Sequence, residues 1–178
     1  MRYAAFLRGL NVGAHNRVRM EPLRNALTDA GLRDVATYLQ SGNVMISNGG
    51  DETPDALLGR LQIGLAAFGL QVQAVLRSVD EMEAVVAANP FGPDDADDSH
   101  RFVTFLGPGL ESPPALAPRS ARGDFEILRA TTTEVYSVAR LVGERYGAPN
   151  GPIEGKLKVA ATTRNWAVVQ AVAGLLRG

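Results

Sequence analysis

The pattern of hydrophobic and polar positions over residues 1–77 predicts strands and helices in the order β-α-β-β-α-β. Short apolar runs rich in β-branched and aromatic residues predict strands, and these runs lie at residues 3–8, 35–39, 44–47 and 70–76. Apolar positions at helical spacing predict helices at residues 22–30 and 54–68, the second with Thr53 as its N-cap. This order is that of the split βαβ, or ferredoxin-like, unit.

The remaining residues, 78–178, predict a shortened version of the same order. Ser78 and Glu81 form a capping-box pattern that opens a helix. Strands follow at residues 101–106, 125–128 and 135–139, and the final helix is expected at about residues 163–176. The prolines within residues 107–118 argue against a long helix there. We therefore expect a second unit whose first helix is replaced by a loop and whose last strand is missing.

Together these patterns predict an α+β fold of two ferredoxin-like (split βαβ) repeats with mainly antiparallel sheets, the second repeat being degenerate. The first half is expected to comprise residues 1–77 and the second half residues 78–178, packed with the first. The evidence for a duplication is the order of the elements, since no residue-level repeat is visible in the sequence.

The composition narrows the classes of function. Hydrophobic residues make up 46% of the chain, which is typical of a globular protein with its own core. Lys and Arg total 18 against 19 Asp and Glu, so binding to nucleic acid or an anionic membrane would need a local basic patch. The absence of cysteine excludes disulfides and thiolate metal or catalytic sites. With neither a signal-peptide pattern nor a membrane-length apolar run, a cytoplasmic protein without a membrane partner is expected.

Residues 8–20, after the first predicted strand, form the main candidate site. The candidate ligand-binding residues there are Arg8, Asn11, Gly13, His15 and Arg17. Glycines let the backbone approach a ligand, and arginine forks match phosphate or carboxylate geometry. The spacing is neither a dinucleotide-binding fingerprint nor a P-loop. The alternative is a long surface connection whose arginines are solvated or paired with carboxylates.

Two other places could contribute to such a site. Gln40, Ser41 and Asn43 are expected at the end of a hairpin, where they either bind a ligand or only form the turn. Arg164 is expected in the first turn of the last helix, with Thr162 or Thr163 as the N-cap. A cation is unfavourable at a helix N-terminus, so we expect Arg164 to face either a carboxylate or a bound anion.

No metal or cofactor site is predicted. The acidic segment around His100 does not have the spacing of a calcium loop, so a solvated loop is expected, and its residues are Asp94, Asp95, Asp97, Asp98 and His100. Residues 151–157 lack the spacing and hydroxyl of a P-loop. Residues 101–105 are interpreted as a core strand rather than an RNA-binding motif.

Several blocks of sequence resemble one bacterial family. They are Leu7-Arg8-Gly9-Leu10-Asn11-Val12-Gly13, Gln40-Ser41-Gly42-Asn43-Val44 and Thr162-Thr163-Arg164-Asn165-Trp166. The family is the domain-of-unknown-function family numbered sixteen ninety-seven. The resemblance implies two ferredoxin-like repeats and no known activity. Members usually carry a longer segment before the last block, of which residues 155–159 remain here, with Lys156 as the candidate for the family's lysine.

The sequence is compatible with three functions. It identifies neither a reaction nor an oligomeric state. The first is binding of a small anionic ligand, such as a phosphorylated one, by the residue 8–20 loop with Arg164, with His15 or Ser41 available for proton handling. The second is binding of single-stranded nucleic acid by the same loop and the sheet. The third is a structural or partner-binding module in which Arg8 and Arg164 pair internally with carboxylates such as Glu21 or Glu134.

Overall fold

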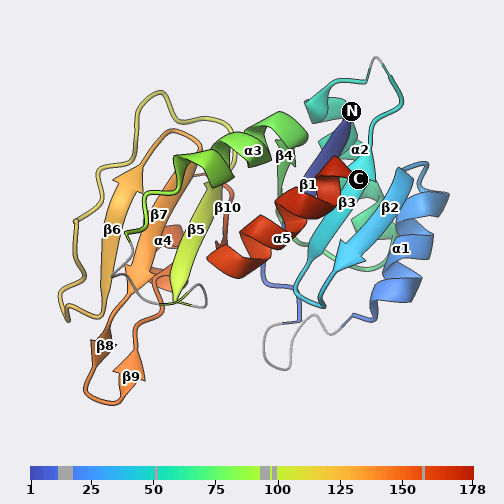
Figure 1. Cartoon of the computed structure of the whole chain (residues 1–178). Coiled ribbons are helices and arrows are strands. Elements are labelled where there is room, and N and C mark those ends of the chain that lie inside the picture. The colour runs from blue at the N-terminus through green and yellow to red at the C-terminus, as the bar shows by residue number, and fades with distance from the viewer. Residues whose placement is uncertain (12–17, 51, 93–96, 98–99, 158) are drawn as a thin grey trace. The chain divides into compact units, whose positions relative to one another are not determined.

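The chain forms a mixed α+β fold of two units, each with a four-stranded antiparallel sheet (Figure 1). The computed structural model describes residues 1–11, 18–50, 52–92, 97, 100–157 and 159–178. The first unit comprises Met1–Ala84 with Val172–Gly178, and the second comprises Val85–Ala171. The C-terminal segment therefore groups with the first unit, whereas the sequence prediction assigned it to the second half.

The first unit follows the predicted order of elements. These elements are β1 (Arg2–Leu7), α1 (Met20–Asp29), β2 (Arg33–Tyr38), β3 (Asn43–Ser47), α2 (Pro54–Ala67) and β4 (Ala74–Ser78). In the sheet, the strands lie in the order β2-β3-β1-β4, and every neighbouring pair is antiparallel. The predicted N-cap of α2 is confirmed, because the Thr53 hydroxyl accepts a hydrogen bond from the Ala56 N–H.

The fourth strand starts later than predicted, at Ala74 rather than at residue 70. The cause is the end of α2, where Gly69 adopts a positive φ of +85°. There the Gly69 N–H donates to the Ala66 carbonyl and the Leu70 N–H donates to the Leu65 carbonyl. This pattern completes the helix terminus. Leu70 is therefore bound to the helix rather than to the sheet.

The core of the first unit lies between its sheet and its two helices. Tyr3, Ala5 and Leu7 on one face of β1 pack in a cluster with buried leucines of α1 and α2, which are Leu23, Leu27, Leu57, Leu61 and Leu65. Ala4 and Phe6, on the other face of β1, are buried as well. A strand that is buried on both faces needs apolar residues at successive positions. This explains why residues 3–7 form a continuous apolar run instead of alternating with polar residues.

The second unit contains more strands than predicted. Its helix α3 (Val79–Ala88) begins in the first unit, and its last helix α5 (Trp166–Arg177) ends there. Between them lie β5 (Arg101–Leu106), β6 (Phe125–Ala130), β7 (Glu134–Ala139), β8 (Leu141–Val142), β9 (Arg145–Tyr146), α4 (Asn150–Glu154) and β10 (Ala161–Asn165). The main sheet has the order β10-β5-β7-β6, and β8 pairs with β9 in a separate hairpin.

The prediction of a missing last strand is wrong, and so is the predicted start of the final helix. The β-branched residues Thr162 and Thr163 extend the chain as β10, which pairs with Phe105 and Thr104 of β5. The helix begins only at Trp166, and the Asn165 side-chain oxygen accepts from the Val168 N–H at 3.0 Å. Asn165 therefore provides the cap that was assigned to Thr162 or Thr163.

When the strands of each four-stranded sheet are numbered separately along the chain, both sheets have the same spatial order: fourth, first, third, second. The β8–β9 hairpin is left out of this count. In the second unit, the connection from β5 to β6 contains no helix over residues 107–124, as the prolines predicted. Within the part of the chain that the structure describes, none of the helices has the length and apolar composition needed to cross a bilayer.

Candidate functional site

Three segments of the first unit meet at the C-terminal end of β1. The Leu7 N–H donates to the Gly42 carbonyl and the Arg8 N–H donates to the Gln73 carbonyl, both at 2.8 Å. Because β1 lies between β3 and β4, its end is flanked by the turn after β2 and by the segment that enters β4. Arg8, the residue 39–42 turn and Gln73 are therefore neighbours, although they are far apart in the sequence.

The side chain of Asn11 closes the base of the loop that follows β1. Its Oδ1 accepts from the Val18 N–H at 2.6 Å, and its Nδ2 donates to the Val18 carbonyl at 3.1 Å and to the Gln40 carbonyl. Asn11 has a positive φ of 55°, a conformation that asparagine tolerates better than most residues. Asn11 thus links Val18 to the residue 39–42 turn, and its amide is used for that purpose.

The turn between β2 and β3 packs closely on the end of β1. Gly42 has a φ of +77°, and a Cβ at this position would lie 2.9 Å from the Leu7 Cβ and 3.2 Å from the Leu10 Cβ. Only glycine fits there without displacement of the neighbours. Leu39, in the same turn, also has a positive φ, 55°, although its side chain is exposed. A bulky residue in this region is strained, and such strain is concentrated at binding and active sites.

The predicted turn residues divide into one buried and two exposed side chains. Asn43 is buried, and its Nδ2 donates to the Tyr38 carbonyl and to the Ser41 Oγ, both at 3.0 Å. Asn43 therefore stabilises the turn. Gln40 and Ser41 are exposed beside it.

Arg8 supplies the positive charge at this end of the sheet. Its side chain is exposed, and its Nη1 donates to the Gln73 side-chain oxygen at 3.2 Å. Gln73 was not among the predicted site residues. Its position in the sequence carries no motif, and it joins the site only because β4 is the neighbour of β1 in the sheet. Among the described residues, the exposed polar groups at this end of the sheet are thus the Arg8 guanidinium, the Gln40 and Gln73 amides and the Ser41 hydroxyl.

Several predicted residues cannot be placed in this arrangement. Gly13, His15 and Arg17 lie outside the described residues, as do Asp94, Asp95 and Asp98 of the acidic segment. Of that segment, Asp97 and His100 are described, with the His100 Nδ1 2.9 Å from the Asp97 Oδ1. Among the described residues, no group of three acidic or histidine side chains could hold a metal ion.

Arg164 lies in the second unit, on β10 rather than in the first turn of α5. Only 9% of the residue is exposed, and its Nη1 donates to the Thr162 Oγ1 and to the Thr163 carbonyl, both at 2.8 Å. Burial lowers the pKa of this guanidinium from its ordinary value to about 10, while the negative charge of Glu154 acts in the opposite direction. These contacts hold the Arg164 side chain within its own unit, and we do not include Arg164 in the site on β1.

Comparison with known proteins identifies the family. Residues 1–136 match the family described as Protein of unknown function (DUF1697). The chain belongs to this family. The match confirms the resemblance inferred from the sequence blocks, and it includes the end of β1, the residue 39–42 turn and Gln73. Arg164 lies beyond it.

A solved structure has a similar fold. The chain is similar to the conserved bacterial protein SP0830 from Streptococcus pneumoniae, with a TM-score of 0.67 and 22% sequence identity. The similarity covers 99% of this chain and 98% of that one, so the mixed α+β architecture extends over the whole of both. No curated protein matches the chain. This member of the DUF1697 family thus shares its fold with a protein whose description names no activity.

Proposed function

We propose that this protein binds a small anionic ligand, such as a phosphorylated metabolite, at the exposed end of β1. The observation that carries the proposal is the pair of backbone hydrogen bonds from Leu7 to Gly42 and from Arg8 to Gln73. They bring the Arg8 guanidinium to the same end of the sheet as the polar side chains of Gln40, Ser41 and Gln73. A guanidinium with several neutral hydrogen-bonding groups around it suits the oxygens of a phosphate or carboxylate.

In this proposal, Asn11, Gly42 and Asn43 are positioning residues. Asn11 holds the loop base, Gly42 allows the close packing of the turn on β1, and Asn43 supports the turn from inside. Ligand contacts come from Arg8, Gln40, Ser41 and Gln73, together with the loop that Asn11 closes. That loop contains Gly13, His15 and Arg17 in its sequence. The backbone of the residue 39–42 turn is held in place before the ligand arrives, which reduces the entropy lost on binding.

Burial of the first sheet favours a small ligand over single-stranded nucleic acid. A sheet that serves as a platform for bases needs exposed aromatic side chains. In β1 and β3 every residue is buried except the half-buried Arg2 and Ser47 at the strand ends. The central strands therefore offer no stacking surface, and the formal net charge of −1 supplies no general attraction to a nucleic acid.

We also propose that the two units are ferredoxin-like repeats. The shared strand order of their sheets supports this interpretation, as does the helix–strand order of the first unit. In the second unit, the residue 107–124 connection takes the position of the first helix in the chain order, and α4 takes that of the second helix.

The test is a thermal-shift titration with sodium phosphate at constant ionic strength. We expect phosphate to raise the Tm of the wild type and of Arg33→Gln, but not of Arg8→Gln. Arg33 is the matched control, because it is an exposed arginine of the same unit at the opposite end of the β2–β3 hairpin. Equal shifts for the wild type and Arg8→Gln would disprove the site.

A second experiment tests the alternative partner, single-stranded nucleic acid, against the small anionic ligand. Single-stranded RNA retained by the wild type at low salt, released steeply as salt rises and lost in Arg8→Gln, would reassign the same surface to nucleic acid.

A further inference from the structure

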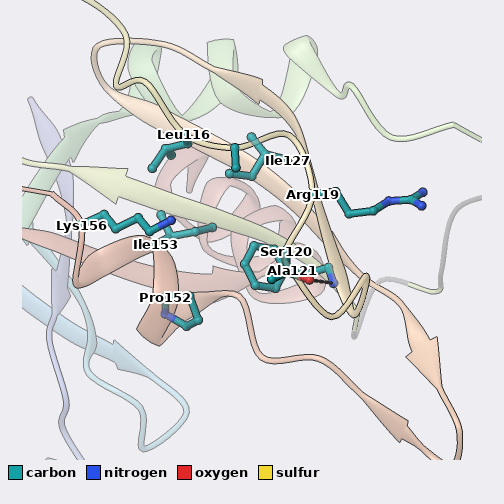
Figure 2. Close-up of a pocket in the computed structure, with 10 residues that line it drawn as sticks. Leu116, Arg119, Ser120, Ala121, Ile127, Pro152, Ile153 and Lys156 are labelled. Atoms are coloured by element: carbon teal, nitrogen blue, oxygen red, sulfur yellow. Dashed lines mark hydrogen bonds between the residues drawn. The ribbon is translucent and has the colours of Figure 1, made fainter.

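A pocket in the second unit lies between the proline-containing connection before β6 and the short helix α4 (Figure 2). Its volume is about 340 Å³, which is within the usual range of small-molecule sites. Most of its lining is apolar, with Leu116 from the connection, Phe125 and Ile127 from β6, and Pro152 and Ile153 from α4. This pocket involves none of the residues of the site on β1.

A connection without a helix covers the pocket. Phe125 and Ile127 belong to the apolar cluster of the second unit, and the connection covers the pocket around them without forming a helix. Hydrogen bonds hold this covering segment: the Ile127 N–H donates to the Pro118 carbonyl at 2.7 Å, and the Ser120 N–H donates to the Phe125 carbonyl at 3.0 Å. The wall of the pocket is thus fixed to the strand by its backbone.

Two cations line the pocket, but they differ in their surroundings. Arg119 forms an ion pair with Glu126, and its side chain is 66% exposed. Figure 2 shows Arg119 extending away from the other side chains drawn. Lys156 lies beside Ile153 in the same view, and among the described residues its ammonium group has no carboxylate partner. The charge available to a molecule in the pocket is therefore that of Lys156.

We propose that this pocket binds a small amphipathic carboxylate, with its apolar body against Phe125, Ile127 and Ile153 and its carboxylate at Lys156. The apolar lining favours a hydrocarbon or aromatic body, because removal of that surface from water is favourable. One ammonium group is a point charge that matches a monoanion, whereas a phosphate dianion is better served by several donors. The proposal is independent of the site on β1, which lies in the other unit.

The test is isothermal titration calorimetry with sodium octanoate below its micellar concentration and with 1-octanol as the neutral analogue. We expect the wild type to bind both probes. Lys156 is an exposed residue, and an ion pair at an exposed ammonium group is weak, so Lys156→Gln is expected to bind octanoate about threefold more weakly and octanol unchanged. Ala117→Trp, which places a large ring at an exposed lining position, is expected to weaken both.

Two control variants keep the result interpretable. Arg122→Gln removes a positive charge from an exposed residue of the same unit that does not line the pocket, so its binding should equal that of the wild type. Arg8→Gln should also leave octanoate binding unchanged, which separates this proposal from the one for the β1 site. Equal octanoate affinity in the wild type and Lys156→Gln, or no binding of either probe by the wild type, would overturn the proposal.

Discussion

At the scale of single residues, the buried polar side chains Asn43 and Arg164 form hydrogen bonds with backbone carbonyls. Asn43 is buried and donates within its own turn, whereas Gln40 and Ser41 beside it face solvent. Arg164 is the extreme case among the buried polar side chains, since it is a charged group with 9% of its surface exposed. Removing a charge from water is costly, and that cost has a measurable dependence on pH.

We predict that the stability of the wild type relative to Arg164→Met increases between pH 9 and pH 11. Burial lowers the pKa of Arg164 to about 10 in the folded protein, below the ordinary value that the guanidinium has in the unfolded chain. In this interval the unfolded chain therefore binds more protons than the folded protein, and the free energy of unfolding rises with pH. The expected gain is about 1 kcal/mol, measured by urea unfolding at each pH.

The control for this prediction is Val169→Ala, which shortens a fully buried side chain in the same unit without removing a titratable group. Its difference from the wild type should not vary over the same interval. If the Arg164→Met difference were equally constant, the guanidinium would not be titrating in the folded protein and the cost of its burial would have to be smaller.

At the scale of elements, the starts of α2, α3 and α5 are fixed by side-chain caps. The predicted capping box before α3 is reciprocal, because the Ser78 N–H donates to the Glu81 Oε2 at 2.7 Å and the Glu81 N–H donates to the Ser78 Oγ at 3.2 Å. The backbone N–H of each residue is thus paired with the side chain of the other residue. We therefore expect the two hydrogen bonds to be energetically coupled.

We predict that Ser78→Ala lowers the free energy of unfolding by about 1 kcal/mol, because the Glu81 N–H loses its acceptor. Glu81→Ala should have a similar effect, and the double variant should cost less than the sum of the two. Urea unfolding of the four proteins gives the coupling free energy directly. Strict additivity would mean that the two hydrogen bonds stabilise the start of α3 independently of each other.

Much of the fold could be predicted because its elements are marked by local chemistry. Thr53 and Pro54 mark the start of α2, Ser78 and Glu81 mark that of α3, and the apolar run at residues 3–7 marks β1. β10 was missed because Thr162 and Thr163 are good N-caps and also good strand residues. Pairing with β5 decided between the two, and this pairing is not visible in the local sequence.

The candidate sites show the same limit. Arg8, Gln40 and Ser41 could be singled out from the residue types in their loop and turn. Gln73 could not, because its place beside Arg8 depends on β4 being the neighbour of β1. The pocket at Lys156 could not be predicted either, because its walls come from three segments brought together only by the fold.

At the scale of the whole molecule, each unit has its own sheet and its own apolar cluster. The first cluster lies among β1, α1 and α2, and the second includes Leu106, Val135 and Ile153. Only α3 and α5 pass from one unit to the other. Separate cores are the condition under which parts of one chain can open separately, so the two sheets are expected to differ in their response to a core substitution.

We predict that Leu61→Ala weakens the first sheet far more than the second. Leu61 is fully buried in the first cluster, and truncation of a buried leucine costs about 2–5 kcal/mol. Native-state hydrogen exchange should show this loss of protection in the amides of β1 and β3, with less than about 1 kcal/mol lost in those of β5 and β7.

The reciprocal variant, Val135→Ala, should reverse the pattern, since Val135 is fully buried in the second cluster. An equal loss in both sheets for either variant would mean that α3 and α5 couple the units into one cooperative structure, in which case a ligand bound at the end of β1 would stabilise the pocket of the second unit to the same extent.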